Sequence, residues 1–87
     1  MYKVAVIILN WNGEKLLREF LPSVIRNTDV ALGEIIVADN CSTDASVELL
    51  KREFPRVKRI LLDRNYGFAG GYNRVIEKVE SEYVVLL

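Results

Sequence analysis

The stretch Asn65–Asn73, NYGFAGGYN, has residue types that suggest chemistry. It contains Gly67, Gly70 and Gly71, and it lies between an apolar run and a helix-like segment. Glycines in such a place allow a positive φ, close packing of a helix on a strand, or close approach of a nucleotide to the backbone. We expect tight packing at Gly70 and Gly71, which lie inside the start of the helix, and ligand approach at Gly67.

The glycine spacing is that of neither familiar phosphate loop. The dinucleotide fingerprint G-x-G-x-x-G should follow the first strand, where this sequence has no such glycines, and the Walker pattern is absent as well. The stretch is therefore not predicted to cradle phosphate. Asn65 and Asn73, at its two ends, either bridge the backbone of the loop itself or contact a ligand, and the sequence favours neither.

Asp39 is a second candidate for binding, because it ends a buried apolar run. A carboxylate there is costly unless it accepts hydrogen bonds. It could accept the ring N–H of a pyrimidine or a ribose hydroxyl, or it could cap a turn at Ser42 or Thr43. Asp44 precedes a helix, where we expect it to satisfy free backbone N–H groups.

Asn10, Trp11 and Asn12 follow the first apolar run. Trp11 could offer its ring to a base or fill the layer above the sheet, and Asn12-Gly13 predicts a turn. The only cysteine is Cys41 and there is no histidine, which excludes an internal disulfide, a Cys–His pair and Cys/His metal sites. Cys41 is therefore predicted to be a small loop residue.

Short apolar runs alternate with amphipathic segments along the chain. The apolar runs predict buried strands at 4–9, 34–39, 57–62 and 83–87. Helical spacing of apolar residues predicts a helix from Glu14 with a kink or a break at Pro22, a second one ending at Pro55, and a third after the glycines. The order βαβαβαβ predicts an α/β, Rossmann-like parallel sheet with helices on both faces, binding ligands beyond the carboxyl ends of its strands.

The composition fits a small folded domain without strong charge. The chain has 87 residues, of which 51% are hydrophobic, with 12 basic and 12 acidic side chains. Bulk electrostatics therefore favour neither nucleic acid nor acidic lipid as a partner. No run approaches the roughly 18–20 apolar residues of a membrane helix, and the N-terminus lacks the features of a signal peptide. We expect a cytoplasmic protein.

Four stretches, taken in order, resemble the inverting family-2 glycosyltransferases of the GT-A fold, and most closely their rhamnosyltransferase-like branch in bacterial polysaccharide synthesis. They are VAVIILNWNG, EIIVADNCSTDAS, NYGFAGGYN and EYVVLL, and together they cover the whole chain. The resemblance implies that residues 1–87 are the N-terminal nucleotide-sugar-binding part of a glycosyltransferase, cut before its acidic metal-binding motif. The nucleotide-binding positions that it implies are Leu9, Asn10, Trp11, Asp39, Asn65, Gly67, Phe68, Gly71 and Asn73. The first three depart from the residues usual in the family.

The resemblance also implies the reaction of the full-length protein. A sugar would pass, with inversion, from a UDP- or dTDP-sugar to a glycan or lipid-linked acceptor, with Mn or Mg at the diphosphate. The metal ligands and the catalytic base would lie outside this chain, so the chain alone is expected to be inactive. Other parts could bring the protein to the inner face of the membrane. The uncovered apolar fourth strand predicts self-association.

Three alternatives differ in class. A non-catalytic nucleotide-binding or interaction module of Rossmann-like fold remains open. A Rossmann dehydrogenase half, with Asp39 on the ribose, is disfavoured by the missing glycine fingerprint. A receiver domain, with Asp39 as phosphoacceptor, is disfavoured because no acidic cluster closes the first strand.

Overall fold

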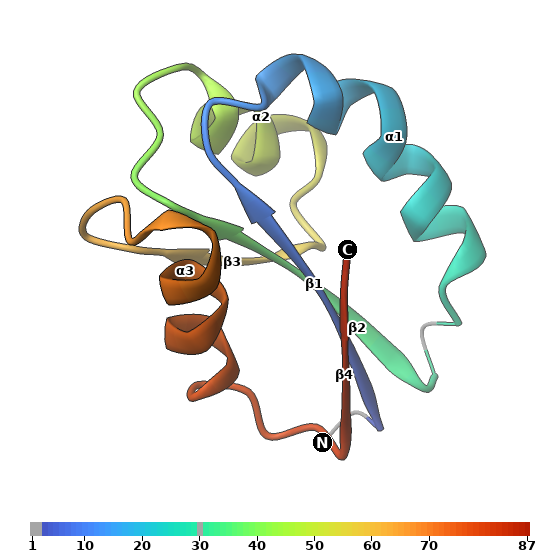
Figure 1. Ribbon diagram of the computed structural model, residues 1–87. Helices are drawn as coiled ribbons and strands as arrows, with labels where there is room; N and C mark the ends of the chain where they lie inside the picture. Colours follow the sequence, from blue (N-terminus) through green and yellow to red (C-terminus); the bar gives the residue numbers. More distant parts are fainter. Residues whose placement is uncertain (1–2, 30) are drawn as a thin grey trace.

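The computed structural model describes residues 3–29 and 31–87 as a parallel four-stranded sheet with helices on both faces (Figure 1). The sheet order is β3-β2-β1-β4, and each neighbouring pair is parallel. The predicted α/β fold and element order are confirmed. In chain order the elements are β1 (Val4–Asn10), α1 (Glu14–Asn27), β2 (Gly33–Asp39), α2 (Ser46–Glu53), β3 (Lys58–Leu61), α3 (Gly67–Ile76) and β4 (Tyr83–Leu86).

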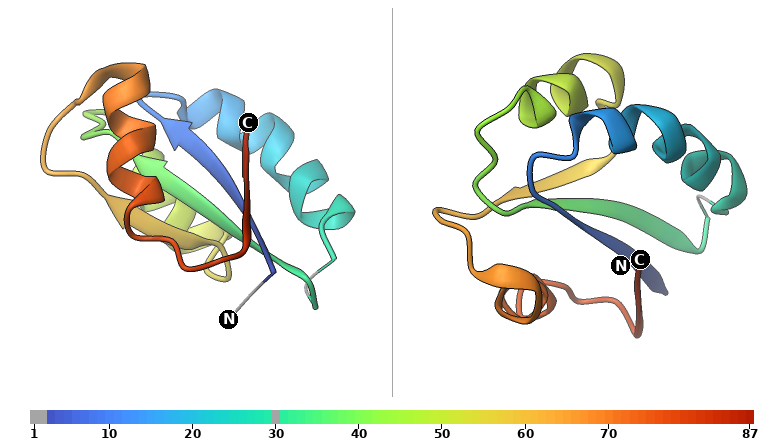
Figure 2. Two further views of the ribbon diagram at one scale, coloured as in Figure 1. Left: turned by 60° about the horizontal axis from the view of Figure 1, so that its bottom comes forward. Right: turned by 45° about the horizontal axis from the view of Figure 1, so that its top comes forward.

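Two apolar layers sandwich the sheet, because successive strand residues point to opposite faces. Helices α1 and α2 cover one face and α3 covers the other, as Figure 2 shows. The α1–α2 layer buries Ile8, Leu17, Leu21, Val37, Leu49, Leu50 and Val57. The α3 layer buries Ala5, Ile7, Ile36, Ala38, Leu62, Tyr72 and Val75. The central strands β1 and β2 are thus covered on both faces, as their unbroken apolar runs predict.

Helix α1 shows no break at Pro22, which was one of the two outcomes predicted there. The helix runs from Glu14 to Asn27 without a break, with Pro22 inside it. Leu17 and Leu21 before the proline, and Val24 and Ile25 after it, pack into the same layer. This packing on both sides holds one helix together although proline cannot donate a backbone hydrogen bond. Within the described residues no helix has the length and apolar character needed to cross a membrane.

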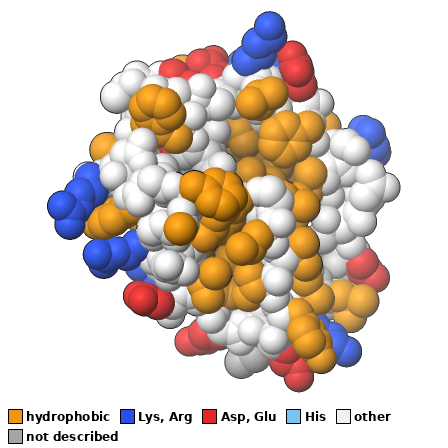
Figure 3. Space-filling view, in the orientation of Figure 1, with side chains coloured by type: hydrophobic (Ala, Val, Ile, Leu, Met, Phe, Trp, Pro, Cys, Tyr) orange, Lys and Arg blue, Asp and Glu red, His pale blue; other side chains and the backbone are white. Residues whose placement is uncertain are grey.

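Strand β4 is exposed along its length, so the prediction that it is buried is wrong. Its four residues, and Leu87 after them, are all exposed. The physical reason is that β4 is an edge strand, paired on one side with β1 and covered by little else in the described residues. Apolar side chains form a broad patch on this side of the molecule (Figure 3). The opposite edge, β3, instead carries the charged pair Lys58 and Arg59.

Strand β1 pairs with β2 from Val4 with Gly33 to Asn10 with Asp39. On its other side it pairs with β4, from Val4 with Tyr83 to Ile7 with Leu86. The chain order reverses between β1 and β4, which makes this the topological switch point where ligands of open parallel sheets bind. Of the predicted binding residues, Leu9, Asn10, Trp11 and Asp39 lie at or next to this carboxyl edge.

Candidate functional site

The carboxylate of Asp39 lies buried where β2 ends. Its Oδ1 accepts hydrogen bonds from Asn10 Nδ2 at 2.9 Å and from the Ser42 hydroxyl at 2.6 Å, and its Oδ2 accepts the Ser42 backbone N–H at 2.8 Å. The residue is 3% exposed. The turn role predicted at Ser42 is confirmed. A carboxylate oxygen can accept about two hydrogen bonds. Oδ2 accepts one, from the Ser42 N–H, and therefore has the capacity to accept one more.

Asn12 ties the loop after β1 to the loop after β2. It adopts a left-handed backbone with φ of 50°, a conformation that asparagine tolerates better than most residues. Its backbone N–H donates to the Ser42 hydroxyl at 2.9 Å, and its Oδ1 accepts the N–H groups of Thr43 at 2.7 Å and Asp44 at 3.2 Å. The predicted turn is present, and it fixes both loops against each other.

Asp44 lies between the N-termini of α1 and α2. Its Oδ1 accepts the Ser46 N–H at 2.9 Å and its Oδ2 accepts the Glu14 N–H at 3.2 Å. Burial raises the pKa of Asp44, but hydrogen bonds from Ser46 and Glu14 outweigh it and hold this pKa below its ordinary value. The structural role predicted for Asp44 is confirmed, and it extends to a second helix.

Most of the glycine stretch is helical, because α3 begins at Gly67. Gly67 has φ of +74° and a Cβ there would meet no atom within 4 Å, so its backbone conformation explains the glycine. Asn65 Oδ1 accepts the Gly67 N–H at 2.7 Å, which confirms the bridge within the loop. Asn73 is exposed on α3. Ligand approach at Gly67 stays a prediction.

Gly71 permits α3 to approach the sheet closely, as predicted. A Cβ at this position would lie 2.8 Å from Leu9 Cδ1 and 3.1 Å from Asn40 Nδ2, which is closer than side chains normally pack. At Gly70 a Cβ would lie 3.2 Å from the Cβ of Tyr66, a milder conflict. The distance between α3 and the end of β1 therefore depends on Gly71.

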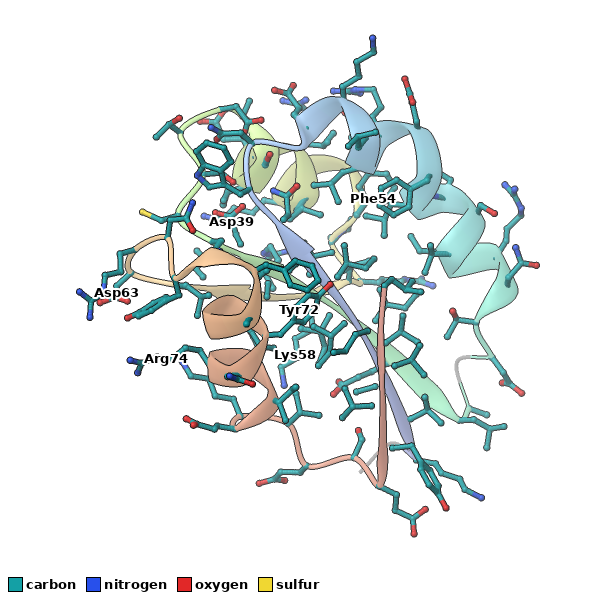
Figure 4. The ribbon with its side chains drawn as sticks, in the orientation of Figure 1. Asp39, Phe54, Lys58, Asp63, Tyr72 and Arg74 are labelled. Atoms are coloured by element: carbon teal, nitrogen blue, oxygen red, sulfur yellow. The ribbon has the colours of Figure 1, made fainter. Side chains whose placement is uncertain are left out.

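A charged cluster occupies the outer side of the glycine stretch. The guanidinium groups of Arg64 and Arg74 lie 5.0 Å and 4.5 Å from the centroid of the Tyr66 ring, within cation–π range. The Tyr66 hydroxyl donates to Asp63, and this hydrogen bond is the main reason why the pKa of Asp63 is lowered. In Figure 4, Asp63 and Arg74 lie on the side of α3 away from β1.

Two aromatic side chains near the carboxyl edge are exposed to solvent. Trp11 is 55% exposed, so it does not fill the layer above the sheet, and Phe68 is 76% exposed with its ring edge-on to Tyr72. Trp11 borders a hollow of about 200 Å³. The hollow is lined by Ile8, Leu9, Asn10, Trp11, Gly13, Leu16, Leu17, Phe20 and Leu87. Leu16 and Phe20 are exposed here, although their spacing predicts the buried face of α1.

A larger hollow, of about 350 Å³, lies at the other end of the sheet. It is formed where β2 and β3 begin, beside the end of α1, and includes Gly33, Lys58 and Thr28. None of the predicted binding residues lines it. We therefore place the candidate site at the carboxyl edge, where Asp39 and the loop network lie.

The described residues do not fit a divalent metal ion. Within 3–29 and 31–87, no three side chains of Asp, Glu, His or Cys gather closely enough to hold one. Asp39 and Asp44 are instead engaged by hydroxyl, amide and backbone donors. No metal ligand is assigned in this part of the chain.

The structure brings together some of the predicted residues and leaves others apart. Asp39 contacts Asn10, and Leu9 packs against Gly71. Asn65 and Asn73 contribute no described contact to Asp39. Residues missed in the sequence are Asn40 and Tyr72, which make hydrogen bonds to Gly67 and Leu9. Neither had a local sequence signal, because both bonds join residues far apart in the chain.

The chain has recognisable relatives. Residues 5–87 match the sequence profile described as glycosyl transferase family 2. The uncharacterized glycosyltransferase YibD of Escherichia coli K12 is 38% identical over 98% of this chain, which corresponds to 25% of the length of YibD. The chain thus spans about a quarter of that relative.

Solved structures share the same fold. A structure of TarS from Staphylococcus aureus in complex with UDP-GlcNAc superimposes with a TM-score of 0.84 at 27% identity, over 98% of this chain and 26% of that one. TarS is named a poly(ribitol-phosphate) beta-N-acetylglucosaminyltransferase. A Pyrobaculum calidifontis mannosyltransferase in complex with GDP-Man and Mn²⁺ has a TM-score of 0.75 at 23% identity, over 90% of this chain and 24% of its own. The latter likeness concerns the fold alone.

Proposed function

Because this chain belongs to glycosyl transferase family 2, we propose that it is the nucleotide-binding part of a glycosyltransferase. The whole protein would transfer a sugar from a nucleotide-sugar donor to a glycan or lipid-linked acceptor, with inversion. Its relatives are longer than the chain, so the catalytic base would come from residues outside it. Residues 1–87 would hold the donor and, alone, would not catalyse transfer.

The observation that carries this proposal is the Asp39 carboxylate at the carboxyl edge. Asn10 and Ser42 fix its orientation with hydrogen bonds of 2.6 to 2.9 Å, and Oδ2 keeps capacity for one more donor. A ring N–H of a pyrimidine or a ribose hydroxyl matches that capacity. The exposed ring of Trp11 lies next to Asn10 and would stack on or border the base.

A UDP- or dTDP-sugar is the donor class that we favour. A pyrimidine base offers the ring N–H that Asp39 would accept, and TarS, a family relative, has been solved with UDP-GlcNAc. TarS is named for a poly(ribitol-phosphate) acceptor, a polymer rich in hydroxyl groups, and a glycan or lipid-linked acceptor offers hydroxyl groups of the same chemistry. The rhamnosyltransferase-like branch stays a prediction.

Three further proposals concern the metal ion, the location of the whole protein and the self-association of this chain. A divalent metal, Mn or Mg, would neutralise the diphosphate and would be held by residues outside this chain. The protein would act in the cytoplasm, at the inner face of the membrane where other parts of it provide an anchor. The exposed apolar edge of β4 would lead the chain to self-associate.

Nucleotide titration tests the donor site. UDP, dTDP and GDP are titrated against the chain by calorimetry, with and without Mn²⁺. We expect weak binding that prefers the pyrimidine nucleotides and is indifferent to Mn²⁺. Absence of binding to the folded chain would count against a donor half-site in these residues and favour the non-catalytic interaction module.

Two variants test whether Asp39 contacts the nucleotide directly or only supports the loops. Asp39→Ala removes the acceptor, whereas Ser42→Ala removes a hydroxyl that donates to Asp39 and accepts from Asn12. If Asp39 touches the nucleotide, Asp39→Ala abolishes binding and Ser42→Ala weakens it by about threefold to tenfold, the worth of one ordinary hydrogen bond. Equal loss in both variants would mean that Asp39 only supports the loops.

A further inference from the structure

The guanidinium groups of Arg64 and Arg74 lie against one aromatic ring. They are 5.0 Å and 4.5 Å from the centroid of the Tyr66 ring, so both are within the range of cation–π attraction. Arg64 precedes α3, whereas Arg74 lies in the last turn of this helix. The ring therefore brings together two positive charges from separate parts of the chain.

Neither of these two arginines has an ion-pair partner within residues 3–29 and 31–87. The ion pairs in this part of the chain are made by Arg18 and Arg52. The nearby carboxylate of Asp63 instead accepts a hydrogen bond from the Tyr66 hydroxyl. Stacking on a ring uses the face of a guanidinium group and leaves N–H donors at its edge available to an anion.

The charges in this part of the sequence are unbalanced. Residues 56–78 contain six basic and two acidic side chains, although the whole chain has 12 of each. In Figure 3, basic side chains gather on the left of the view, at the edge where Figure 4 labels Asp63 and Arg74 in the same orientation. The zero net charge of the chain thus conceals a basic surface, and such a surface attracts anions.

This basic surface lies apart from the candidate nucleotide site. Arg74 and Asp63 are on the side of α3 away from β1 (Figure 4). Asp39 and Asn10, in contrast, meet at the carboxyl edge where β1 and β2 end. An anion held by the two arginines would therefore be distinct from a nucleotide held at Asp39.

We propose that Arg64 and Arg74, held on the ring of Tyr66, bind a phosphate group of a ligand other than the donor nucleotide. A guanidinium group matches the spacing of phosphate oxygens and can donate two parallel hydrogen bonds to them. A phosphate group offers several acceptor oxygens and up to two negative charges, so one group can engage both arginines. It would belong either to a lipid headgroup or to a soluble phosphate ester. This site does not rest on the proposed function, because it makes no use of Asp39.

Inorganic phosphate tests the site in solution. It is titrated against the isotope-labelled chain at constant ionic strength, with chloride as the control anion, and the amide shifts are followed by NMR. We expect shifts confined to the surroundings of Arg64, Tyr66 and Arg74. The double variant Arg64→Gln with Arg74→Gln should bind phosphate at least about tenfold more weakly, the worth of one hydrogen bond to a charged group. Equal shifts with chloride would overturn the proposal.

A matched control removes the same charge from the other face of the sheet. Arg26→Gln with Arg52→Gln changes two exposed arginines on α1 and α2, which cover that face (Figure 2). This variant should bind phosphate as tightly as the unaltered chain. Equal weakening in both double variants would show unspecific attraction to positive charge and would overturn the site.

Two single variants test the arrangement and the place of the site. Tyr66→Leu removes the ring that holds both guanidinium groups and should weaken phosphate binding by about threefold. Unchanged affinity in this variant would contradict a site organised by Tyr66. Asp39→Ala should bind phosphate like the unaltered chain, and a loss there would place the phosphate in the donor site and overturn a separate one.

Vesicles then identify the source of the phosphate group. The chain is sedimented with vesicles of phosphatidylcholine alone or of phosphatidylcholine with phosphatidylglycerol. Binding to the second kind that Arg64→Gln with Arg74→Gln abolishes assigns the site to a lipid headgroup. Specific binding of inorganic phosphate without vesicle binding assigns it to a soluble phosphate ester. Absence of both, or equal binding by the double variant, overturns the proposal.

Discussion

Asn40 and Gly67 are joined by a hydrogen bond of 3.0 Å, from the Asn40 side-chain Nδ2 to the Gly67 carbonyl. The same side chain accepts the Tyr66 N–H through Oδ1 at 2.9 Å. Helix α3 has no side-chain cap from its own N-cap residue. Its start is therefore held by a buried residue that follows β2, and this bond ties the glycine stretch to the end of the strand that carries Asp39.

Removing the Asn40 amide should loosen the glycine stretch. For Asn40→Ala we expect the free energy of unfolding to fall by about 1–3 kcal/mol, because two backbone groups lose their partner at a buried position. Urea denaturation followed by circular dichroism measures it. Asn73→Ala, on the exposed side of α3, is the control and should stay within about 0.5 kcal/mol. Equal effects of both changes would contradict a holding role for Asn40.

The two glycines Gly67 and Gly71 should respond differently to alanine. Gly67→Ala meets no atom but places alanine at a φ of +74°, which costs about 1 kcal/mol. Gly71→Ala pushes on Leu9, whose Cδ1 would lie 2.8 Å from the new carbon, and overpacking costs about 1–3 kcal/mol. Urea denaturation measures both changes.

The double variant Leu9→Ala with Gly71→Ala distinguishes the two causes. Shortening Leu9 makes room for the new methyl group, so the pair should be less destabilised than the sum of its single changes. The combination of Leu9→Ala with Gly67→Ala should be additive. Additivity in the first pair would show that Leu9 is not what excludes a side chain at position 71.

The central strands could be predicted from the sequence because a strand covered on both faces must be apolar throughout. Strand β4 is equally apolar, yet it is exposed, since an apolar run does not say what covers it. Pro22 predicts a kink or a break from local chemistry, but α1 continues past it, with Leu21 and Val24 packed in the same layer. Burial is thus decided by neighbours that lie far away in the sequence.

In the candidate site, too, local contacts could be predicted from the sequence and contacts between distant residues could not. The contact of Asp39 with Ser42 spans three residues and follows from local turn chemistry. The bond between Asn40 and Gly67 spans 27 residues, and that between Leu9 and Tyr72 spans 63. Such contacts depend on how closely α3 sits on the sheet. The glycines predicted this close approach, but no local pattern names Asn40 and Leu9 as the residues that meet α3.

The exposed edge of β4 should drive self-association. Its residues are apolar, whereas the other edge, β3, carries Lys58 and Arg59, and charged residues protect an edge strand from pairing. We expect size-exclusion chromatography over a dilution series to show species larger than a monomer. Val84→Lys should raise the dissociation constant about tenfold, the effect of about 1.4 kcal/mol. Leu61→Lys, an equivalent change on β3, should leave it unaltered, and a clean monomer at all concentrations would contradict the prediction.

Asp44 should make stability depend on pH in the acid range. Its folded-state pKa is held below the ordinary value of 3.8: burial raises it, but the hydrogen bonds from Ser46 and Glu14 lower it more. A carboxylate with a lowered folded pKa stabilises the native state at pH values above its unfolded pKa, and this contribution is lost as the pH falls through the folded pKa. At pH values well above 3.8, the free energy of unfolding of Asp44→Asn should therefore be lower than that of the unaltered chain by a constant amount. Below pH 3.8 this difference should shrink. Urea denaturation of both chains across this range measures the difference, and a deficit that does not change with pH would mean that Asp44 does not act through its charge.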